Sequence, residues 1–285
     1  MLRQINTIFS SFNKITWNDI HVNIIVSTGR TGTEFLARFF NEGFRGVYAL
    51  HEPVPDLYDL GVDYIKKKIV GRRAVMEFKK DREKICHEVH RRNCNVYVES
   101  NTNLWCLIPL FRRIFKQYKI VCVIRDGRDY VRSCYSKIVE SKTGGKTLFI
   151  EDDDSRTRIK AIDFKDDPYY SQWGDMDRFE RLCWHWVKKN TIMVNHLENE
   201  KKVLVVKFEE IFNSASGFPG LNRIIDFCGI QDRRFLTYTE YAKRMSSRVN
   251  ANSSYELPSW KNWDESLKKK FDQIAGKSMR QLGYL

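Results

Sequence analysis

Long apolar runs are missing from this sequence. No stretch approaches the roughly 20 apolar residues that a helix needs to cross a bilayer. Residues 1–21 also lack the apolar core and the small-residue cleavage site of a secretory signal peptide. We therefore expect neither a transmembrane segment nor a leader.

An even, clustered set of cysteines is missing as well. The seven cysteines are scattered, and several lie in apolar runs, such as Cys122 in IVCVI. This usage is typical of reduced core residues and predicts a cytoplasmic location. Residues 86–94 (CHEVHRRNC) have helical ligand spacing but lack the second ligand pair of common zinc sites, so no metal is expected.

Repeats and low-complexity linkers are absent. With 285 residues, 42% of them hydrophobic and 30% charged, the chain is expected to form a single folded domain over 1–285. The polar segment 142–175 is expected to be a lid or insertion, or else an ordinary solvated loop. A net charge of +13 favours anionic partners: nucleic acid, a nucleotide, a sulfated or phosphorylated acceptor, or an acidic membrane surface.

Short β-rich apolar runs alternate with helical patterns along the chain. This order is typical of an α/β fold in which a parallel sheet lies between two helical layers. The expected strands cover 22–27, 46–50, 96–100, 119–124 and 202–208. The expected helices cover 33–42, 104–118, 177–197, 221–227 and 266–282, and one more begins at about Tyr130.

The turn after the first expected strand reads STGRTGT, residues 27–33. Backbone N–H groups and a helix N-terminus converge on an anion at such a turn. An ATP or GTP loop needs a lysine directly after its second glycine. Here Gly32 is followed by Thr33, and the cation, Arg30, precedes that glycine. The loop therefore predicts a phosphate site but disfavours an ordinary nucleoside triphosphate.

A second pattern follows the expected strand at 119–124. Residues 125–136 read RDGRDYVRSCYS. Together with RTGT at 30–33, this pattern resembles the superfamily of sulfotransferases that use 3′-phosphoadenosine 5′-phosphosulfate (PAPS). The stretches VLVVKFEEI at 203–211 and WKNW at 260–263 are similar to later parts of that family. The resemblance covers most of the chain and implies a P-loop NTPase-like sulfotransferase fold, a three-layer parallel sheet flanked by helices.

The resemblance also implies where PAPS binds. The 5′-phosphosulfate is expected on the loop, with Arg30 stabilising the charge that develops on the departing phosphate. Arg125 and Ser133 are expected to hold the 3′-phosphate, whereas Arg128 and Asp129 are expected to form an ion pair within their own loop. The complete expected donor set is Thr28, Gly29, Arg30, Thr31, Gly32, Thr33, Glu34, Phe35, Arg125, Ser133 and Arg248. Cationic side chains and a helix N-terminus replace a metal in this scheme.

Two members of that set carry alternatives. Phe35 occupies the place of a family tryptophan that packs on adenine, but its helical position also suits a core residue. Arg248 lies in a segment that departs from the family's Arg-Lys-Gly pattern, so its contact with the 3′-phosphate has the weakest basis.

A general base is expected on the acceptor side. Glu52 follows the second expected strand directly, at the sheet edge where ligands of open α/β folds bind. Carbohydrate-modifying branches of the family place a glutamate similarly, and others use a histidine after the third strand, which is absent here. His51 and Glu99 are the alternatives, and a further interpretation is that Glu52 only caps the turn that follows it.

The leading hypothesis is therefore transfer of a sulfuryl group to a hydroxyl of a glycan, lipid or small molecule, with anionic or carbohydrate acceptors suited to the charge. One alternative is a P-loop kinase, which the missing lysine disfavours. Another is a nucleic-acid-binding module, which the dispersed positive charge disfavours. The basic stretch 66–82 is expected to be a solvated helix face or an acceptor surface.

Overall fold

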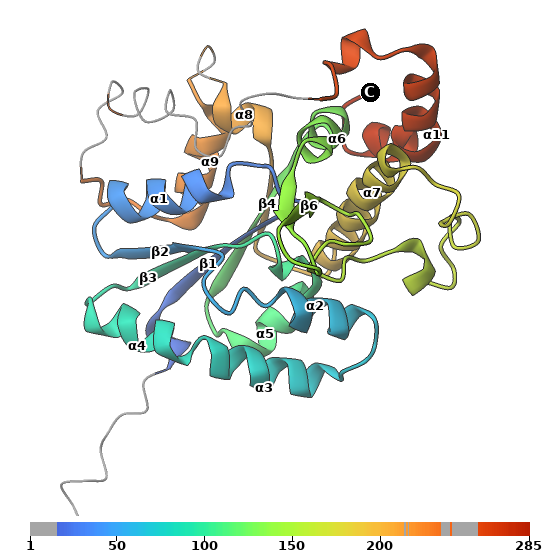
Figure 1. Ribbon diagram of the computed structural model, residues 1–285. Coiled ribbons are helices and arrows are strands. Elements are labelled where there is room, and N and C mark those ends of the chain that lie inside the picture. The colour runs from blue at the N-terminus through green and yellow to red at the C-terminus, as the bar shows by residue number, and fades with distance from the viewer. Residues whose placement is uncertain (1–15, 214, 216, 235–239, 241–255) are drawn as a thin grey trace, which may run out of the picture.

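The computed structural model describes residues 16–213, 215, 217–234, 240 and 256–285. A five-stranded parallel sheet lies at its centre, in the order β2-β3-β1-β4-β7 (Figure 1). The five strands are β1 His21–Ser27, β2 Val47–His51, β3 Val96–Ser100, β4 Tyr118–Ile124 and β7 Val203–Lys207. A separate antiparallel ribbon pairs β5 (Ile138–Glu140) with β6 (Lys146–Leu148).

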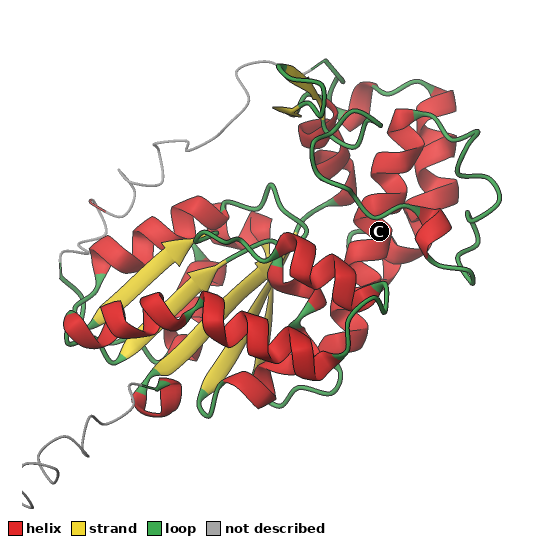
Figure 2. Cartoon of the chain, turned by 60° about the horizontal axis from the view of Figure 1, so that its bottom comes forward, coloured by secondary structure: helices red, strands yellow, loops and turns green. Residues whose placement is uncertain are grey.

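Helices cover both faces of the sheet, which confirms the three-layer α/β class (Figure 2). One face carries α1 Thr33–Gly43, α8 Phe208–Phe212 and α9 Pro219–Cys228. The other carries α2 Tyr58–Ile65, α3 Gly71–Asp81, α4 Glu83–Arg91, α5 Phe111–Ile114 and part of α7 Arg178–Leu197. Beside the sheet, α7 also packs with α6 Gly127–Tyr135 and α11 Glu265–Gln281. Within the described residues, no helix is both long and apolar enough to cross a membrane.

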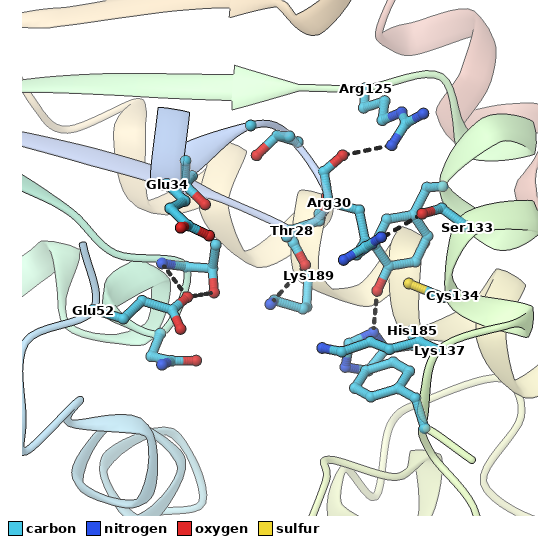
Figure 3. A pocket seen from close by; sticks show the side chains of 18 of the residues that line it. Thr28, Arg30, Glu34, Glu52, Arg125, Ser133, Cys134, Lys137, His185 and Lys189 are labelled. Carbon is cyan, nitrogen blue, oxygen red and sulfur yellow. Dashed lines mark hydrogen bonds between the residues drawn. The ribbon is translucent and has the colours of Figure 1, made fainter. Parts of the chain in front are cut away.

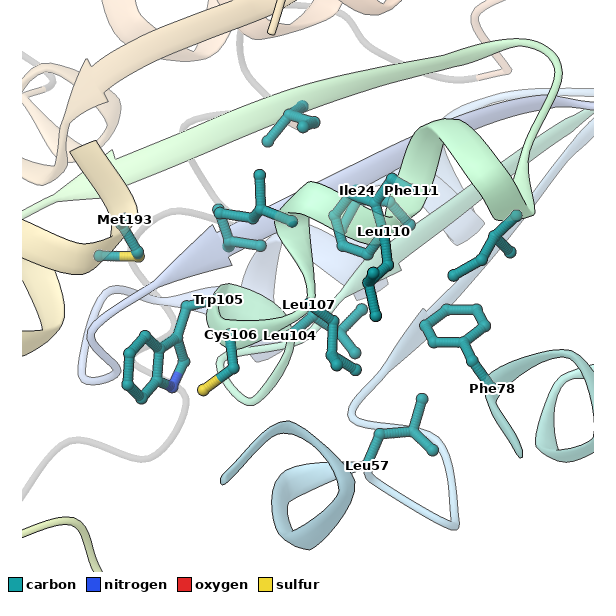
Figure 4. Close-up of a cluster of buried hydrophobic side chains, with 14 of the residues drawn as sticks. Ile24, Leu57, Phe78, Leu104, Trp105, Cys106, Leu107, Leu110, Phe111 and Met193 are labelled. Carbon is teal, nitrogen blue, oxygen red and sulfur yellow. The ribbon is translucent and has the colours of Figure 1, made fainter. Parts of the chain in front are cut away.

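The central strand β1 is buried along nearly its whole length, including the apolar run at 24–26. Side chains alternate across a strand, and a parallel strand between two helical layers is covered on both sides. Ile24 and Val26 accordingly belong to one core cluster and Ile25 to the other. Figure 4 shows Ile24 in the same buried cluster as Trp105 and Phe111. The sheet therefore supplies a rigid platform whose carboxyl edge carries the loops discussed below.

The prediction of one helix over 104–118 is wrong. The segment forms two 3₁₀ turns, Leu104–Cys106 and Ile108–Leu110, followed by the four-residue α5. Pro109 lies in the second turn and has no backbone N–H, so it cannot donate a bond to an α-helical ladder at that point. The apolar residues still form core, which is why the pattern resembled a helix.

Two polar segments also differ from the expectation of solvated structure. In 142–175, Phe149, Ile150 and Ile159 are buried, so the segment is not an ordinary solvated loop. In the basic stretch 66–82, Arg82 is fully buried in an ion pair with Glu99, and the stretch is therefore not uniformly a solvated face. In both places a distant partner buries residues that local polarity assigns to the surface.

Candidate active site

The loop after β1 has the backbone geometry of an anion-binding turn. Gly29 and Gly32 have φ of 97° and 70°, values that glycine adopts without strain. A Cβ atom at Gly32 would also lie 2.3 Å from Cζ of Phe212, so the approach of α8 requires glycine there. The Ser27 hydroxyl accepts bonds from the Gly29 amide at 3.1 Å and the Thr31 hydroxyl at 2.7 Å. These contacts fix the turn ahead of the N-terminus of α1.

The two sequence patterns of the donor side meet in space. β1 and β4 are neighbours in the sheet, so the segments that follow them lie side by side. Arg30 Nε donates to Ser133 Oγ at 2.9 Å, and Arg125 Nη1 donates to the Arg30 carbonyl at 2.5 Å (Figure 3). The Arg125 guanidinium stacks 4.4 Å from the centre of the Phe208 ring. A cationic cluster therefore lies where the resemblance implies two phosphates.

The prediction that Arg128 forms an ion pair with Asp129 names the wrong carboxylate. Arg128 pairs with Asp126, whose carboxylate also caps α6 by accepting from the Arg128 amide at 2.8 Å. An N-cap carboxylate two residues before the arginine satisfies both groups at once. Asp129 instead lines the cavity described next, where burial raises the pKa of its carboxyl.

A cavity of about 1120 Å³ opens at the carboxyl edge of the sheet. Nearly all of the predicted site residues line it, namely Thr28, Gly29, Arg30, Thr31, Gly32, Thr33, Glu34, Phe35, His51, Glu52, Arg125 and Ser133. Phe35 is buried and packs against Phe39 and Phe212, as a core residue does, and its packing on adenine stays a prediction. Arg248 lies outside the described residues.

Glu52 faces this cavity from the end of β2. Its Oε1 accepts bonds from the Thr102 hydroxyl and, at 3.4 Å, from the Thr102 amide. Its φ is 39° and that of Arg30 is 58°, so both residues occupy the left-handed region, which is costly outside glycine and clusters at functional sites. The carboxylate is thus held by the neighbouring β3 end and directed into the cavity (Figure 3).

The two alternatives to Glu52 differ in accessibility. His51 lines the cavity and its Nδ1 lies 3.0 Å from the Ser100 carbonyl. Glu99 is fully buried below the cavity, where it accepts bonds from Arg82 at 2.7 and 2.9 Å and from Tyr97 at 2.9 Å. A carboxylate in this network is a structural ion-pair partner, and Glu99 does not line the cavity.

The sequence analysis missed several cavity residues. Lys137 follows α6, Arg158 lies in the segment after β6, and His185 and Lys189 project from α7. Burial lowers the pKa of Lys137 and, to about 8, the pKa of Lys189, and it holds the pKa of His185 well below its usual range. Tyr130 is 2.9 Å from Nδ1 of this neutral histidine.

One signal for these residues was present in the sequence. His185 and Lys189 lie four residues apart, on the same stripe of α7 as the buried Leu182 and Met193. A lysine within a buried stripe is uncommon unless its charge has a partner or a role. Lys137 and Arg158 carry no such signal, because their segments have no helical or strand periodicity.

Metal-ligand geometry is not evident in the part of the chain that the structure describes. No group of three or more His, Cys, Asp or Glu side chains in those residues is arranged to hold a metal ion. In the 86–94 segment, Cys86 is buried and His90 Nε2 lies 3.0 Å from the Thr16 carbonyl.

Several solved structures are similar to this chain. The sulfotransferase domain from the curacin biosynthetic pathway is 15% identical with a TM-score of 0.49, and the match covers 94% of this chain and 99% of that one. Mouse sulfotransferase SULT7A1 complexed with PAP is 15% identical with a TM-score of 0.47 (95% and 90% covered). Sulfotransferase STF1 from Mycobacterium tuberculosis H37Rv is 12% identical with a TM-score of 0.45 (90% and 78% covered).

The family comparison is more decisive than these distant likenesses. No curated protein matches the sequence. The family model of the sulfotransferase domain, however, matches residues 21–282, which include the sheet, both donor-side patterns and the terminal helix. This match confirms the resemblance inferred from the loop and the pattern after β4. The chain therefore belongs to the sulfotransferase domain family.

Proposed function

We propose that this sulfotransferase moves the sulfuryl group of PAPS to an acceptor hydroxyl, with Glu52 as the general base and without a metal. The observation that carries the proposal is the convergence of Arg30, Ser133 and Arg125 at the ends of two adjacent strands, in one cavity with Glu52. The product on the donor side is adenosine 3′,5′-bisphosphate (PAP).

Unpaired polar atoms in the cavity support an oxygen-rich ligand. Among the described residues, Thr28 Oγ1 and Arg125 Nε are buried without a hydrogen-bond partner, and both residues line the cavity. A buried polar group that lacks a partner costs about 1–3 kcal/mol. Phosphate and sulfuryl oxygens offer such atoms the partners they lack, which favours a bound ligand with two anionic ends.

The donor end requires stabilisation of a departing phosphate. As the bond between sulfur and the bridging oxygen breaks, its electron pair moves to the 5′-phosphate. Arg30 and the amides at the start of α1 meet that charge with fixed donors, which is the most effective form of electrostatic catalysis. Arg125 and Ser133 bind the 3′-phosphate and so select PAPS over donors that lack it.

The acceptor end requires removal of a proton. Glu52 takes the hydroxyl proton as the new bond between oxygen and sulfur forms, and it releases that proton to solvent after product leaves. The two hydrogen bonds from Thr102 orient the carboxylate for this step. The acceptor is a glycan, lipid or small molecule that binds in the cavity, whose lining also includes Tyr58 and Phe149.

Transfer of labelled sulfate tests this proposal. Purified protein is incubated with labelled PAPS and a panel of sugars, phenols, sterols and peptides. We expect a labelled ester together with an equal amount of PAP. Transfer of label from the γ-phosphate of ATP, and none from PAPS, would contradict the proposal.

A further inference from the structure

Lys189 occupies a position that neither donor pattern accounts for. It projects from the middle of α7, only 5% exposed, and its Nζ donates to the Thr28 carbonyl at 3.1 Å. Its ammonium also lies 5.3 Å from the centre of the Trp105 ring. In the view of Figure 3, Lys189 lies between Glu52 and Arg30.

The charge of Lys189 has no carboxylate partner within ion-pair distance among the residues described. Its neighbours are instead mixed in sign. Glu52 at the cavity wall favours the ammonium, whereas Arg158 and Lys137 disfavour it. Burial keeps the Cys106 thiol and the His185 ring uncharged, because it raises the pKa of the first and lowers the pKa of the second. Burial is the largest influence and lowers the pKa of Lys189 to about 8.

A buried cation without an anion is costly, and proteins retain such groups where a ligand supplies the missing charge. Beside Lys189, the buried Thr28 hydroxyl also has no partner among the described residues. The two groups belong to different elements and both line the cavity. Together they present a cation and an unpaired hydroxyl at the start of the phosphate loop.

We propose that Lys189 binds the oxygens of the sulfuryl group itself. This inference rests on the proposed function, and its geometric basis is that Lys189 donates to the Thr28 carbonyl on the phosphate loop and lines the same cavity as Glu52 and Arg30. In a direct displacement, sulfur lies between the attacking hydroxyl and the departing phosphate. Glu52 marks the first of these and Arg30 the second, so a cation held on the phosphate loop in the same cavity is placed to meet the sulfuryl oxygens.

The chemical balance leaves Lys189 unchanged. The acceptor oxygen forms a bond to sulfur, its proton moves to Glu52, and the electron pair of the broken bond leaves with the 5′-phosphate. Lys189 keeps its proton, and its ammonium stays bound to the sulfuryl oxygens during the transfer. It is therefore a catalytic residue that recognises the transferred group, whereas the two donor patterns recognise the carrier nucleotide.

This division has a direct consequence for ligand selectivity. PAPS and PAP share both phosphates and differ only in the sulfuryl group. Loss of Lys189 should therefore weaken PAPS binding and spare PAP binding. Two variants test this: Lys189→Met removes the charge and the donor, and Lys189→Gln removes the charge but keeps a donor for the Thr28 carbonyl.

Calorimetric titration of each protein with PAPS and with PAP, without acceptor, gives the readout. We expect the Kd for PAPS to rise about tenfold or more in both variants, since hydrogen bonds to charged groups contribute about 1.5–3 kcal/mol. The Kd for PAP should change less than about threefold, which is the size of effect expected when a substitution removes no contact with the ligand. The matched control is Lys188→Met, because Lys188 is adjacent on α7 but pairs with Asp167 outside the cavity.

The outcomes separate this inference from the proposed function. If the wild type binds neither ligand, the proposed function fails. If the wild type binds both and the Lys189 variants lose PAPS and PAP equally, or lose neither, the role of Lys189 is wrong and the proposed function stands. Should Lys189→Met fold poorly, Lys189→Gln gives the same comparison.

A pH series supplies a second test, because a lysine with a purely structural role would not change how the affinity for PAPS relative to PAP depends on pH. Below about pH 8 Lys189 is protonated in the free protein, and above it the charge is lost. The affinity for PAPS relative to PAP should therefore fall as the pH rises through this range in the wild type. The same ratio should stay flat in Lys189→Gln, and an unchanged slope there would contradict the assignment.

Discussion

The proposed donor half and the proposed acceptor half of the cavity are built in different ways. The donor half consists of two continuous segments, 27–33 and 125–133, which follow adjacent parallel strands. The acceptor half instead draws on single side chains from separate parts of the chain, such as Glu52 after β2 and Thr102 after β3. A local segment can be recognised from its own residues, whereas a distributed wall exists only after folding.

The two halves also differ in what holds them in place. Glycines, capping bonds and short contacts within the loops shape the donor half. The acceptor half depends on a buried network below Glu52, in which Arg82 binds both Glu99 and the Pro55 carbonyl at 2.7 Å. Asn101 links the same carboxylate to the loop through the Asp56 carbonyl. Four substitutions probe this contrast.

Replacement of Glu52 should have the largest effect, and it should change turnover without changing binding of the donor nucleotide. In Glu52→Gln, we expect turnover to fall about 10³-fold, in the range typical of a lost general base. Binding of PAP should stay unchanged, because the amide has the same shape and the donor half is intact. The measurement is kcat beside the Kd for PAP, with Glu140→Gln as a control carboxylate on the rim of the same cavity. Unchanged turnover would exclude Glu52.

Replacement of Glu99 should lower the stability of the fold without removing a group that takes part in the reaction. Glu99→Gln leaves Arg82 buried without its counter-charge, and removal of one partner from a buried pair costs about 3–5 kcal/mol. We expect the free energy of unfolding in urea to fall by that order. The control is Glu88→Gln, whose ion pairs with Arg91 and Arg92 are on the surface and matter far less. Full stability with lost turnover would show instead that Glu99 acts in catalysis.

Replacement of Arg125 should affect the donor half alone. In Arg125→Met, we expect the affinity for PAP to fall about tenfold to a hundredfold, because one charged contact to phosphate is lost. The affinity for adenosine 5′-phosphate, which lacks the 3′-phosphate, should stay the same. Titration with both nucleotides checks this. Equal losses for the two ligands would mean that Arg125 acts through its bond to the Arg30 carbonyl.

Replacement of Thr102 should have the smallest effect, on the acceptor half. Thr102→Val removes the hydroxyl that orients Glu52 and keeps the side-chain shape. A hydrogen bond of this kind contributes about 0.5–1.5 kcal/mol, so kcat should fall about threefold to tenfold. Steady-state kinetics and the Kd for PAP give the comparison. A loss of PAP affinity would contradict the assignment of Thr102 to the acceptor half.

The sequence predicted best what depends on neighbours along the chain. The β1 turn, the pattern after β4 and the alternation of strands with helices all follow from local residue order, and the structure has them where they were expected. It also predicted that Glu52 follows β2, since the end of a strand is a local feature. The lid expected at 142–175 remains a prediction.

Most of the errors and omissions involve partners that are distant in the chain; the pairing of Arg128 with Asp126 is a local exception. Arg82 looked like a surface charge because Glu99, its partner, lies 17 residues away on another element. The break at Pro109 was visible, but the core that keeps its apolar neighbours buried was not. Lys137 and Arg158 reach the cavity only through tertiary packing, and neither segment carries a periodic signal.

Ligand-induced thermal stabilisation of the wild-type protein tests the central claim most directly. Three ligands are compared at equal concentration: PAP, ATP with magnesium, and an oligonucleotide. We expect PAP to raise the melting temperature most, because it alone offers both phosphates in the arrangement of Arg30, Ser133 and Arg125. Stabilisation by ATP with magnesium or by the oligonucleotide, and none by PAP, would contradict it.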